Sequence, residues 1–317
     1  MNKKIPIIAI VGPTATGKTS LSVNLAEIIG GEIISCDSMQ IYKDMHIASA
    51  APDFEEKRGI PHHLFEVKSR NEIYSVAEYV KDAKDIVSQV YSRDNMPIFV
   101  GGTGLYISSL VDNITFLEEK TSQDLRLRLE KEYEVLGGQE MLKRLAVFDK
   151  ISAETIHPNN KKRVIRAFEI YQTTGITMSE QLKMSKTLPS PFEPYIIGLK
   201  AEDRSFIYNR INKRVDIMLE NGLLEEAERA YISGGSATAV QAIGHKEFFR
   251  YFNGEISLDE AVETLKRETR RYAKRQLTWF SRDERIEWID IDKTDNIIDT
   301  ALKILERKGF FEQKKIN

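Results

Sequence analysis

The sequence predicts an α/β fold: a phosphate-binding, parallel-sheet core with helices on both faces, interrupted by a helical insertion domain. Three observations lead to this expectation. Apolar runs of strand length alternate with amphipathic helical patterns in the first third of the chain, glycine-rich or polar sequence follows three of these runs, and a charged helical stretch separates them from a later apolar run. Strands and helices that alternate in this way favour a parallel sheet with right-handed crossover connections.

Each element in the first part of the core has its own signal. Strands are short apolar runs that end in glycine or polar residues, and helices place apolar side chains on one face. The expected elements are strand Ile5–Val11, helix Thr19–Ile29 (ended by Gly30 and Gly31), strand Glu32–Cys36, helix Asn71–Tyr91 and strand Pro97–Val100. Because ligands of parallel sheets bind where strands end, three stretches are expected to line one cleft: Gly12–Thr19, Asp37–Gln40 and Gly101–Thr103.

The pattern changes near Thr115, where it becomes helical and rich in arginine, lysine and glutamate, and it changes back after the proline-rich stretch Leu188–Pro194. We therefore expect residues 1–115 and 192–317 to form the core and residues 116–191 to form the helical insertion domain. The later core elements are expected to be strand Tyr195–Leu199, helix Arg204–Glu220, helix Glu260–Phe280, strand Ile286–Ile291 and helix Asn296–Lys308.

Composition narrows the classes of function. The chain has 317 residues, 41% hydrophobic and 30% charged, which is typical of a folded globular protein. Its formal net charge of −2 means that any binding of nucleic acid must come from a local patch. One cysteine, Cys36, excludes an internal disulfide and a thiolate zinc cluster and is typical of a reducing compartment. Without an apolar run of membrane-spanning length, we expect a cytoplasmic protein with no membrane partner.

The stretch GPTATGKT matches the motif G-x-x-x-x-G-K-[ST], with the preceding strand and following helix that the motif requires. Its glycines allow the turn, and the amides of the loop and of the helix N-terminus hold oxyanions. Lys18 adds a positive charge, and the Thr19 hydroxyl is the expected ligand of Mg²⁺. The predicted diphosphate-binding residues are Gly12, Pro13, Thr14, Ala15, Thr16, Gly17, Lys18 and Thr19.

A phosphate-binding loop alone indicates a diphosphate and leaves the reaction open. A nucleoside triphosphatase also needs a carboxylate at the end of an apolar strand to hold magnesium. The candidates are Asp37, after the second strand, and Asp290, in the last one, whereas the strand Pro97–Val100 ends in glycines. Asp37 is therefore either a magnesium ligand of a phosphotransferase or a base that acts on a second substrate.

Basic side chains recur on one face of the expected helix Glu260–Phe280, interrupted only by Glu263, and apolar residues that include Tyr272 and Trp279 occupy the opposite, core-facing arc. Because a solvated helix face usually mixes both signs of charge, this pattern favours contact with RNA phosphates. The basic residues are Lys266, Arg267, Arg270, Arg271, Lys274 and Arg275. A second cluster, in the insertion, is compatible with either an RNA contact or an ordinary surface helix: Lys161, Lys162, Arg163 and Arg166.

Two smaller features receive structural interpretations. His62 and His63 could suggest a metal site, but no nearby carboxylate or cysteine completes one, so a loop that lines the cleft is expected. Cys36 is expected to be buried at the end of its strand.

The sequence resembles the tRNA dimethylallyltransferases, also called tRNA isopentenylpyrophosphate transferases, in colinear motifs along nearly the whole chain. Besides Gly12–Thr19, these motifs are Asp37–Tyr42 (DSMQIY), Ile60–Leu64 (IPHHL), Tyr74–Ala77 (YSVA), Val100–Tyr106 (VGGTGLY), Ile156–Asn159 (IHPN), Arg163–Ala167 (RVIRA), Gln241–Gly244 (QAIG) and Lys274–Phe280 (KRQLTWF).

The resemblance implies transfer of a dimethylallyl group from dimethylallyl diphosphate to N6 of adenosine 37 in the anticodon loop of tRNA. It implies that Asp37 is the general base, that Thr103 lies beside the substrates, and that Arg214, the phosphate-binding loop and Mg²⁺ stabilise the diphosphate leaving group. Together with the basic helix face, it gives these expected tRNA contacts: Asp37, Ser38, Met39, Gln40, Thr103, Arg126, Lys162, Arg163, Val164, Ile165, Arg166, Gln241, Ala242, Ile243, Gly244, His245, Lys246, Arg270, Arg271, Lys274 and Arg275.

The chain departs from the family pattern at two positions. Asn160 stands where the family usually has aspartate, and either residue can cap the following helix. His245 replaces the usual tyrosine, and either side chain can stack on a base. Three other functions stay open at this point: a kinase or nucleoside triphosphatase, an isopentenyltransferase that modifies free AMP, and an RNA-binding module without activity. The main expectation is a monomeric tRNA-modifying transferase.

Overall fold

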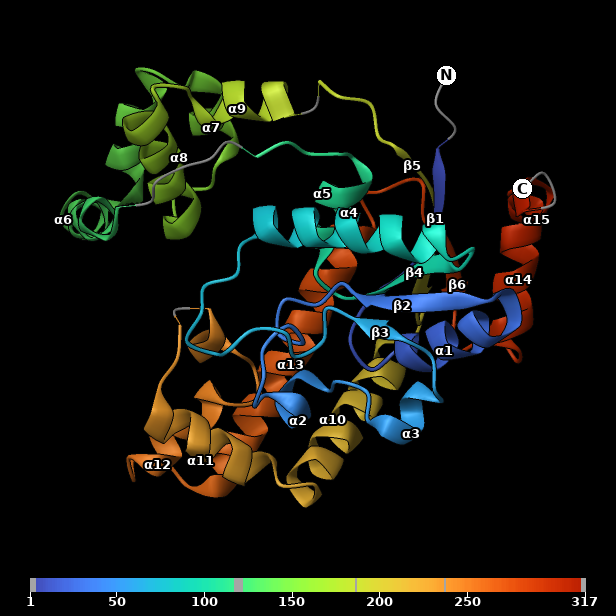
Figure 1. The fold of residues 1–317 in the computed structure, drawn as a ribbon. Coiled ribbons are helices and arrows are strands. Elements are labelled where there is room, and N and C mark those ends of the chain that lie inside the picture. Colours follow the sequence, from blue (N-terminus) through green and yellow to red (C-terminus); the bar gives the residue numbers. More distant parts are fainter. Residues whose placement is uncertain (1–3, 117–121, 186, 237, 315–317) are drawn as a thin grey trace. The chain divides into compact units, whose positions relative to one another are not determined.

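The computed structural model describes residues 4–116, 122–185, 187–236 and 238–314, and it divides the chain into two compact units (Figure 1). Unit 1 comprises Met1–Val111 and Pro191–Asn317, and unit 2 comprises Asp112–Ser190. The insertion expected at residues 116–191 overlaps unit 2, which begins at residue 112. Part of the stretch where the insertion was expected to begin, residues 117–121, lies outside the described residues.

Unit 1 contains a parallel sheet whose strands follow the order β3-β2-β4-β1-β5-β6. The strands are β1 (Ile5–Val11), β2 (Gly31–Ser35), β3 (His62–His63), β4 (Met96–Gly101), β5 (Phe192–Lys200) and β6 (Glu287–Asp290). Val11 pairs with Gly101, and Ser35 pairs with Val100. The register therefore brings the carboxyl ends of β1, β2 and β4 to the same edge of the sheet.

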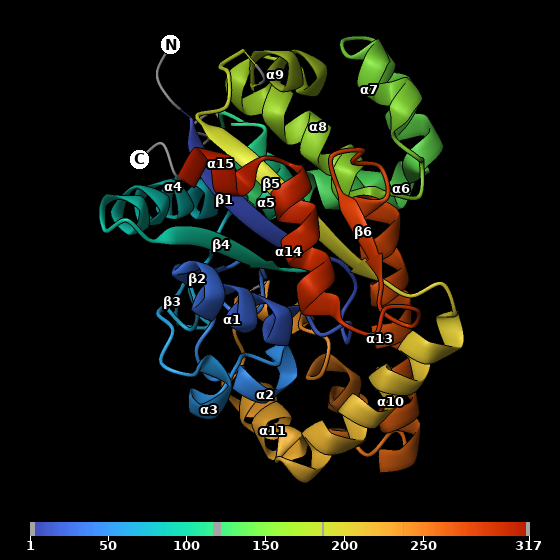
Figure 2. The same ribbon diagram turned by 90° about the vertical axis from the view of Figure 1, so that its right-hand side faces the viewer.

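Helices cover both faces of this sheet, as predicted. Helices α1 (Lys18–Ile29) and α14 (Ile297–Arg307) pack together on one face (Figure 2), and α4 (Val76–Ser92) and α5 (Gly104–Val111) pack together on the other. Because side chains alternate along a strand, Ile8 and Ile10 of β1 join the core with α1 and α14. Ile7, Ala9 and Val11 are equally buried but lie outside that cluster.

Helix α4 begins five positions later than expected because Ser75 caps it. The Ser75 hydroxyl accepts a hydrogen bond from the Glu78 amide at 3.2 Å, and the Glu78 carboxylate accepts one from the Ser75 amide at 2.8 Å. This reciprocal capping box fixes the start of a helix. The other expected core elements are present, with ends that differ from the expected ones by at most three residues.

A second apolar cluster of unit 1 packs α10, α11 and α13 around Phe248, which is fully buried. The remaining elements of unit 1 are α2 (His46–Ser49), α3 (Phe54–Lys57), α10 (Arg204–Glu220), α11 (Leu223–Ser233), η1 (Ala239–Gln241), η2 (Lys246–Phe248), α12 (Phe249–Phe252), α13 (Leu258–Phe280) and α15 (Phe310–Lys314). Contacts between α10 and α13, and between α13 and α5, place the long helix α13 beside the sheet.

Unit 2 is helical and has its own core. Its helices are α6 (Gln123–Ala146), α7 (Lys150–Thr155), α8 (Lys161–Thr174) and α9 (Met178–Ser185). The α6 segment is broken at Gly137, whose φ of 75° is left-handed. Asn160 caps α8 by accepting a hydrogen bond from the Arg163 amide, as expected for either asparagine or aspartate there. Among the described residues, none of the helices is long and apolar enough to cross a membrane.

Candidate active site

The phosphate-binding loop lies between β1 and α1, at the carboxyl edge of the sheet. Gly12 has a φ of +134°, and a Cβ atom there would lie 2.3 Å from the carbonyl oxygen of Leu199. Gly17, with φ +91°, directly precedes α1. The Thr16 hydroxyl closes the turn by donating to the Pro13 carbonyl at 2.8 Å. The loop therefore has the backbone that lets amides at a helix N-terminus hold an anion.

Three basic side chains converge on this loop. The Lys18 ammonium donates to the Pro13 carbonyl at 2.6 Å, and Arg214 donates to the Thr14 hydroxyl at 3.3 Å. Burial, and next the positive charge of Arg214, lower the pKa of Lys18 to about 7. Arg210, which sequence reasoning missed, donates to the Ala15 carbonyl at 2.7 Å. The sequence could have identified Arg210, because it lies four residues before Arg214 and the two side chains therefore share one face of α10.

Asp37 follows β2 and lies close enough to Lys18 and Arg214 for their charges to act on it. Its Oδ1 accepts a hydrogen bond from the Met39 amide at 2.9 Å. Burial raises the pKa of Asp37, and this effect outweighs the backbone hydrogen bonds and the two positive charges, which lower it. The structure therefore places a carboxylate with increased basicity beside the phosphate-binding loop.

Thr103 joins the end of β4 to the turn that carries Asp37. Its hydroxyl accepts a hydrogen bond from the Ser38 amide at 2.9 Å and donates to the Ser38 hydroxyl at 3.3 Å. Its own amide donates to the Cys36 carbonyl at 3.1 Å. This close approach requires glycine at position 101, because a Cβ there would lie 2.2 Å from the Cys36 oxygen. Cys36 is buried, as predicted.

Gln276 of α13 links two of these strand ends, although sequence reasoning did not single it out. Its Oε1 accepts from the Thr14 amide at 2.8 Å, and its Nε2 donates to the Gly102 carbonyl at 3.1 Å. A Cβ at Gly102 would lie 1.9 Å from that Nε2 atom. Gln276 is 5% exposed and sits between Ala273 and Phe280 on the buried side of α13. In the sequence, the position of this polar residue on the apolar face of the helix was the signal that could have identified Gln276.

Two residues assigned to the core-facing arc of α13 lie elsewhere. Tyr272 is half-buried, and burial and then the negative charge of Asp37 raise the pKa of its hydroxyl. Trp279 is 45% exposed, and its ring lies against Gly104, where a Cβ would be 2.1 Å from its Cδ1 atom. The predicted helical periodicity of α13 was correct, but the arc predicted to face the core also contains residues that lie at the edge of the candidate site.

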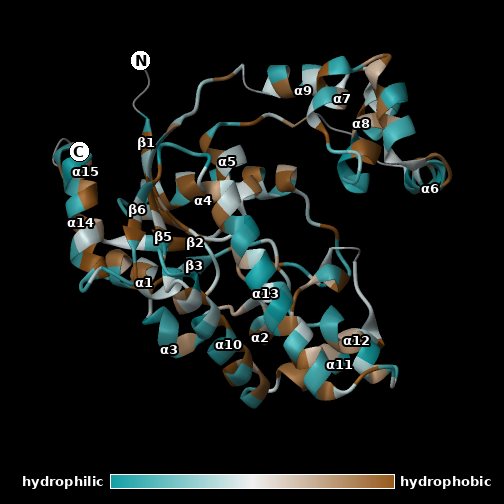
Figure 3. Ribbon diagram, turned by 180° about the vertical axis from the view of Figure 1, so that it is seen from behind, coloured by the Kyte–Doolittle hydropathy of each residue, from teal (hydrophilic) through white to brown (hydrophobic). Residues whose placement is uncertain are grey.

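The basic face of α13 is more mixed than expected. The helix is mainly hydrophilic in Figure 3, but Glu268 pairs with Arg271 at 2.6 Å and is a second acidic interruption. Lys266 pairs with Asp216 at 2.7 Å, and the neighbouring Arg270 donates to the Asn212 side chain at 2.6 Å. Among the described residues, two exposed cations of this face have no ion-pair partner: Lys274 and Arg275.

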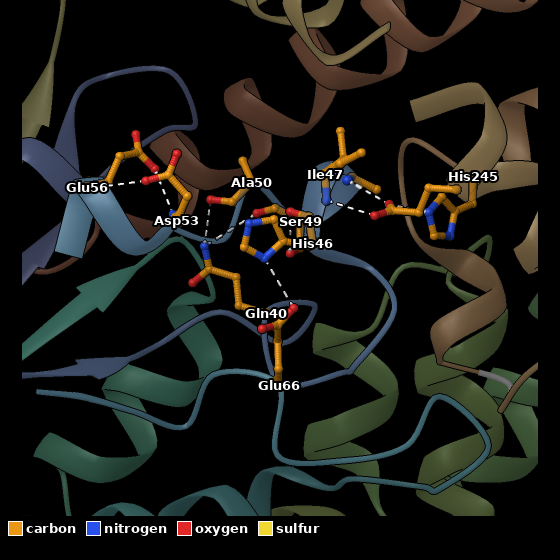
Figure 4. Close-up of polar contacts among 11 residues, drawn as sticks. Gln40, His46, Ile47, Ser49, Ala50, Asp53, Glu56, Glu66 and His245 are labelled. Atoms are coloured by element: carbon orange, nitrogen blue, oxygen red, sulfur yellow. Dashed lines mark hydrogen bonds and ion pairs between the residues drawn. The ribbon is translucent and has the colours of Figure 1, made fainter. Parts of the chain in front are cut away.

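The segment after Asp37 is held by side-chain amides. The Gln40 Nε2 donates to the carbonyls of Ala50 and Ser49 at 3.2 and 3.4 Å, as drawn in Figure 4. Its Oε1 accepts from the Ser35 hydroxyl at 2.9 Å. Gln40 therefore connects the end of β2 to helix α2. Residues Asp37–Gln40 are half-buried.

His245 is part of the interior and does not face a ligand. It is fully buried and hydrogen-bonded to Glu226 at 2.8 Å, whose carboxylate also accepts from the Ile47 and Ala48 amides at 2.8 and 2.9 Å (Figure 4). Burial would raise the pKa of Glu226, but these hydrogen bonds outweigh it and lower the pKa. The expectation that His245 stacks on a base is wrong, because its ring faces this carboxylate.

Several other expected tRNA contacts are also core residues. Val164 and Ile165 are buried in unit 2, and Ala242 and Gly244 are buried in unit 1. Side-chain contacts with RNA from Val164, Ile165 and Ala242 are excluded in this structure. The exposed residues of the expected set include Lys162, Arg163, Gln241 and Arg126, and Arg126 pairs with Glu130 at 3.2 Å and with Glu169 at 3.5 Å.

His62 and His63 form the short edge strand β3, which corrects the expectation of a loop. His63 lies 2.6 Å from the Glu32 carboxylate, which also accepts hydrogen bonds from Arg93 and Asn95. This network ties the sheet edge together and belongs to the fold. Among the described residues, no group of three or more histidine, cysteine, aspartate or glutamate side chains could hold a metal ion.

Comparison with known proteins places this geometry in a family. The sequence model described as IPP transferase matches residues 40–283. A tRNA dimethylallyltransferase of Caldanaerobacter subterraneus subsp. tengcongensis is 46% identical over 291 residues, which cover 91% of this chain and 92% of that relative. Such a match extends well beyond the phosphate-binding motif.

Comparison with solved structures leads to the same family. A tRNA isopentenylpyrophosphate transferase from Bacillus halodurans superimposes with a TM-score of 0.70 at 42% identity, over 98% of this chain and 97% of that one. A eukaryotic dimethylallyltransferase, described as acting on tRNA, superimposes with a TM-score of 0.81 at 29% identity, over 98% of this chain and 80% of that one. By its sequence and its fold, the chain belongs to the IPP transferase family of transferase enzymes.

Proposed function

We propose that this transferase moves a dimethylallyl group from dimethylallyl diphosphate to N6 of adenosine 37 in the tRNA anticodon loop. The observation that carries the proposal is the position of Asp37, a half-buried carboxylate beside a phosphate-binding loop and close enough to Lys18 and Arg214 for their charges to act on it. The relatives named tRNA dimethylallyltransferase support the choice of donor and acceptor.

The chemistry assigns a role to each side of the site. The allylic carbon–oxygen bond of the donor breaks, the bond from that carbon to N6 forms, and diphosphate leaves. Lys18, Arg210 and Arg214 offset the negative charge of the leaving group. The amine loses a proton as the new bond forms, and Asp37 accepts it. An ordinary carboxylate is a weak base, so the raised pKa of Asp37 favours this transfer.

Mg²⁺ fits this site as a partner of the diphosphate. Among the described residues there is no ready-made cluster of three ligands, and Mg²⁺ is commonly held by one or two protein oxygens together with substrate phosphates and water. The Thr19 hydroxyl, in the first turn of α1, would supply a protein oxygen. When bound, the ion supplies further electrostatic stabilisation of the leaving diphosphate.

The RNA is proposed to approach along α13. Lys274 and Arg275 are exposed on this helix, within two positions of Gln276, which holds the phosphate-binding loop. Phosphate contacts by such cations position a nucleic acid without reading its sequence. The acceptor adenosine has to leave its stack so that N6 can reach Asp37.

The test is incubation of the protein with dimethylallyl diphosphate, Mg²⁺ and unmodified tRNA, followed by mass spectrometry of the nucleosides and of nuclease fragments. The expected product is N6-dimethylallyladenosine at position 37. A parallel reaction offers AMP as acceptor, and another offers ATP without a prenyl donor. Modified AMP with unmodified tRNA would identify a mononucleotide prenyltransferase, and ATP hydrolysis with no prenyl transfer would identify a nucleoside triphosphatase.

A further inference from the structure

Helix α2 is capped by a side chain from another part of unit 1. Its own N-cap residue, Met45, makes no side-chain cap. Instead, the carboxylate of Glu226 in α11 accepts hydrogen bonds from the Ile47 amide at 2.8 Å and from the Ala48 amide at 2.9 Å. These are the second and third amides of the helix, which an N-cap side chain normally binds. Glu226 therefore fixes the start of α2 from outside the segment.

Helix α2 in turn supports the segment Asp37–Gln40, which carries the proposed base. The Gln40 Nε2 atom donates to the carbonyls of Ala50 and Ser49, at the end of α2, at 3.2 and 3.4 Å (Figure 4). The Gln40 Oε1 atom accepts from the Ser35 hydroxyl of β2 at 2.9 Å. A displacement of α2 would therefore disturb the segment that presents Asp37 to the acceptor.

Glu226 is joined on its other side to the segment Gln241–Lys246. Its Oε1 atom lies 2.8 Å from Nε2 of His245, which is fully buried. Because an ionised carboxylate can only accept, Nε2 carries the proton of this hydrogen bond. The neighbouring Gly244 lies against α2, since a Cβ atom there would be 2.9 Å from the Cβ atom of Ala48. The second segment is therefore packed directly on α2 and bonded to its cap.

One buried carboxylate thus connects two segments that are far apart in the sequence. We propose that Glu226 is a positioning residue for the RNA acceptor, which holds Asp37–Gln40 and Gln241–Lys246 in a single arrangement. The first segment contains the proposed base, the second keeps Gln241 exposed, and both belong to the expected tRNA contacts. The proposal rests on the proposed function, because the acceptor that these segments would bind is tRNA.

The phosphate-binding loop has separate supports. Gln276 of α13 accepts from the Thr14 amide at 2.8 Å, and Arg210 of α10 donates to the Ala15 carbonyl at 2.7 Å. A change at Glu226 should therefore affect the acceptor and leave binding of the donor unchanged.

The test is Glu226→Gln, with prenyl transfer measured while each substrate is varied in turn. The carboxamide keeps the shape of the side chain, but its NH2 group faces groups that can only donate. We expect the KM for tRNA to rise about tenfold, the effect of losing roughly one hydrogen bond to a charged group. The KM for dimethylallyl diphosphate should not change. A merely structural role would instead lower the thermal midpoint and raise both KM values.

A pair of His245 variants tests the same connection while Glu226 keeps its charge. The pair is needed because burial lowers the pKa of Arg70 and the charges of Asp44 and Glu226 oppose this, so that Glu226→Gln also affects Arg70. His245→Leu removes the donor and should raise the KM for tRNA about fivefold. His245→Gln places an N–H donor where Nε2 lies and should restore the wild-type KM.

Glu228→Gln is the matched control, because Glu228 is exposed on the same helix. It should keep both KM values of the wild type.

An unchanged KM for tRNA in Glu226→Gln would overturn the proposal, and so would equal rises in both KM values. If Glu226→Gln does not fold, the His245 pair decides, and an equal KM for tRNA in its two members would overturn the proposal. Failure of the wild-type protein to prenylate tRNA would instead overturn the proposed function. The two failures are therefore distinguishable.

Discussion

Lys18 and Asp37 show how burial shifts the pKa values of single residues in directions that suit this reaction. Burial is the largest influence on both, and it acts in opposite directions because it disfavours each charged form. The pKa of Lys18 falls to about 7, and the pKa of Asp37 rises above its usual value. A bound anion would stabilise the charged form of Lys18, and a hydrogen-bond donor would stabilise the charged form of Asp37. The site therefore favours binding of a diphosphate at Lys18 and of an amine at Asp37.

Asp37→Ala is expected to abolish prenyl transfer, with a loss of at least about 100-fold in the single-turnover rate, because no base remains beside the acceptor amine. Binding of tRNA, measured by filter retention, should largely persist, since phosphate contacts provide most of the affinity. The shape-matched variant Asp37→Asn should share the loss of rate. Near-normal turnover in either variant would show that Asp37 is not the base.

Lys18 is expected to make donor binding depend on pH. Below pH 7 the amine is charged with or without the donor, so its titration does not affect affinity. Above about pH 7 the free protein loses this proton and binding has to take it up, so affinity should fall by up to about tenfold per pH unit. Calorimetric titration with dimethylallyl diphosphate at increasing pH measures this dependence.

Lys18→Met is the control for that experiment. It should bind the donor more weakly, with a flatter pH dependence, because the titrating amine is gone. An equally steep pH dependence in this variant would assign the effect to another group.

Residues with a fixed local motif could be predicted from the sequence, and residues placed by tertiary contacts could not. The loop Gly12–Thr19 is defined by its spacing, and its backbone matches that motif. The role of Gln276 depends on the Thr14 amide, which is 262 positions away in the chain. His245 was misjudged for the same reason, because the partner that buries it, Glu226, comes from another helix.

Helix α13 combines three tasks in one element. Its apolar residues pack against the core, Tyr272 and Gln276 contribute to the candidate site, and Lys274 and Arg275 face solvent. The existence of this helix was predictable, since Ser257 and Glu260 form a capping box ahead of a strong apolar period. The charge balance of its exposed face was not predictable, because Asp216 of another helix neutralises part of it.

Lys274→Gln is expected to weaken tRNA binding and to flatten its salt dependence. Each released phosphate contact should reduce the slope of log K against log salt by about 0.7–0.9. Binding measured over a range of salt concentrations gives this slope. Arg275→Gln should have a similar effect, because neither residue has an ion-pair partner among the described residues.

Lys266→Gln provides the comparison on the same helix. Lys266 is 16% exposed and already paired with Asp216, so its loss should leave the slope unchanged. Equal slopes for the wild type and the Lys274 variant would remove this helix face from the RNA interface.

At the scale of the whole molecule, the sequence predicted the parallel sheet, the helices on both its faces and a separate helical region. Alternation of strand and helix is a strong signal because crossover connections are restricted to one hand. Strand β3 was not predicted, because a segment of two residues is too short to show an alternating pattern of apolar and polar side chains. Only its pairing with Ile33 and Ile34 of β2 defines it as a strand. The C-terminal end of unit 2 was predicted to within one residue, because the proline-rich stretch Leu188–Pro194 marks it, whereas its start was placed four residues too late.

Glu32 is expected to make the stability of unit 1 sensitive to acid. Burial would raise the pKa of Glu32, but hydrogen bonds from Arg93, Asn95 and His63 outweigh it and lower the pKa to about 2. Because the folded pKa is lowered, the stabilisation is complete above the usual value of 4.5 and is lost as the pH falls toward 2. Glu32→Gln should lower the free energy of unfolding at neutral pH by about 2 kcal/mol, a value reduced for the half-exposed Arg93.

Urea unfolding at several pH values tests this prediction, and the difference between wild type and variant should shrink in acid. Glu287→Gln is the control, because its pairs with Arg307 and Lys308 are surface pairs and should contribute less than about 1 kcal/mol. A pH-independent difference for Glu32→Gln would assign its effect to packing.

The pairing of β1 with β5 has a consequence for synthesis on the ribosome. The whole of unit 2 is translated between these neighbours, so one side of β1 lacks its partner until Phe192–Lys200 has emerged. At the usual speed of translation this interval lasts on the order of ten seconds. An apolar strand with an open edge invites wrong pairing, whereas the local contacts of helical unit 2 form quickly. We therefore expect the nascent chain to be most exposed to wrong strand pairing while unit 2 is being translated.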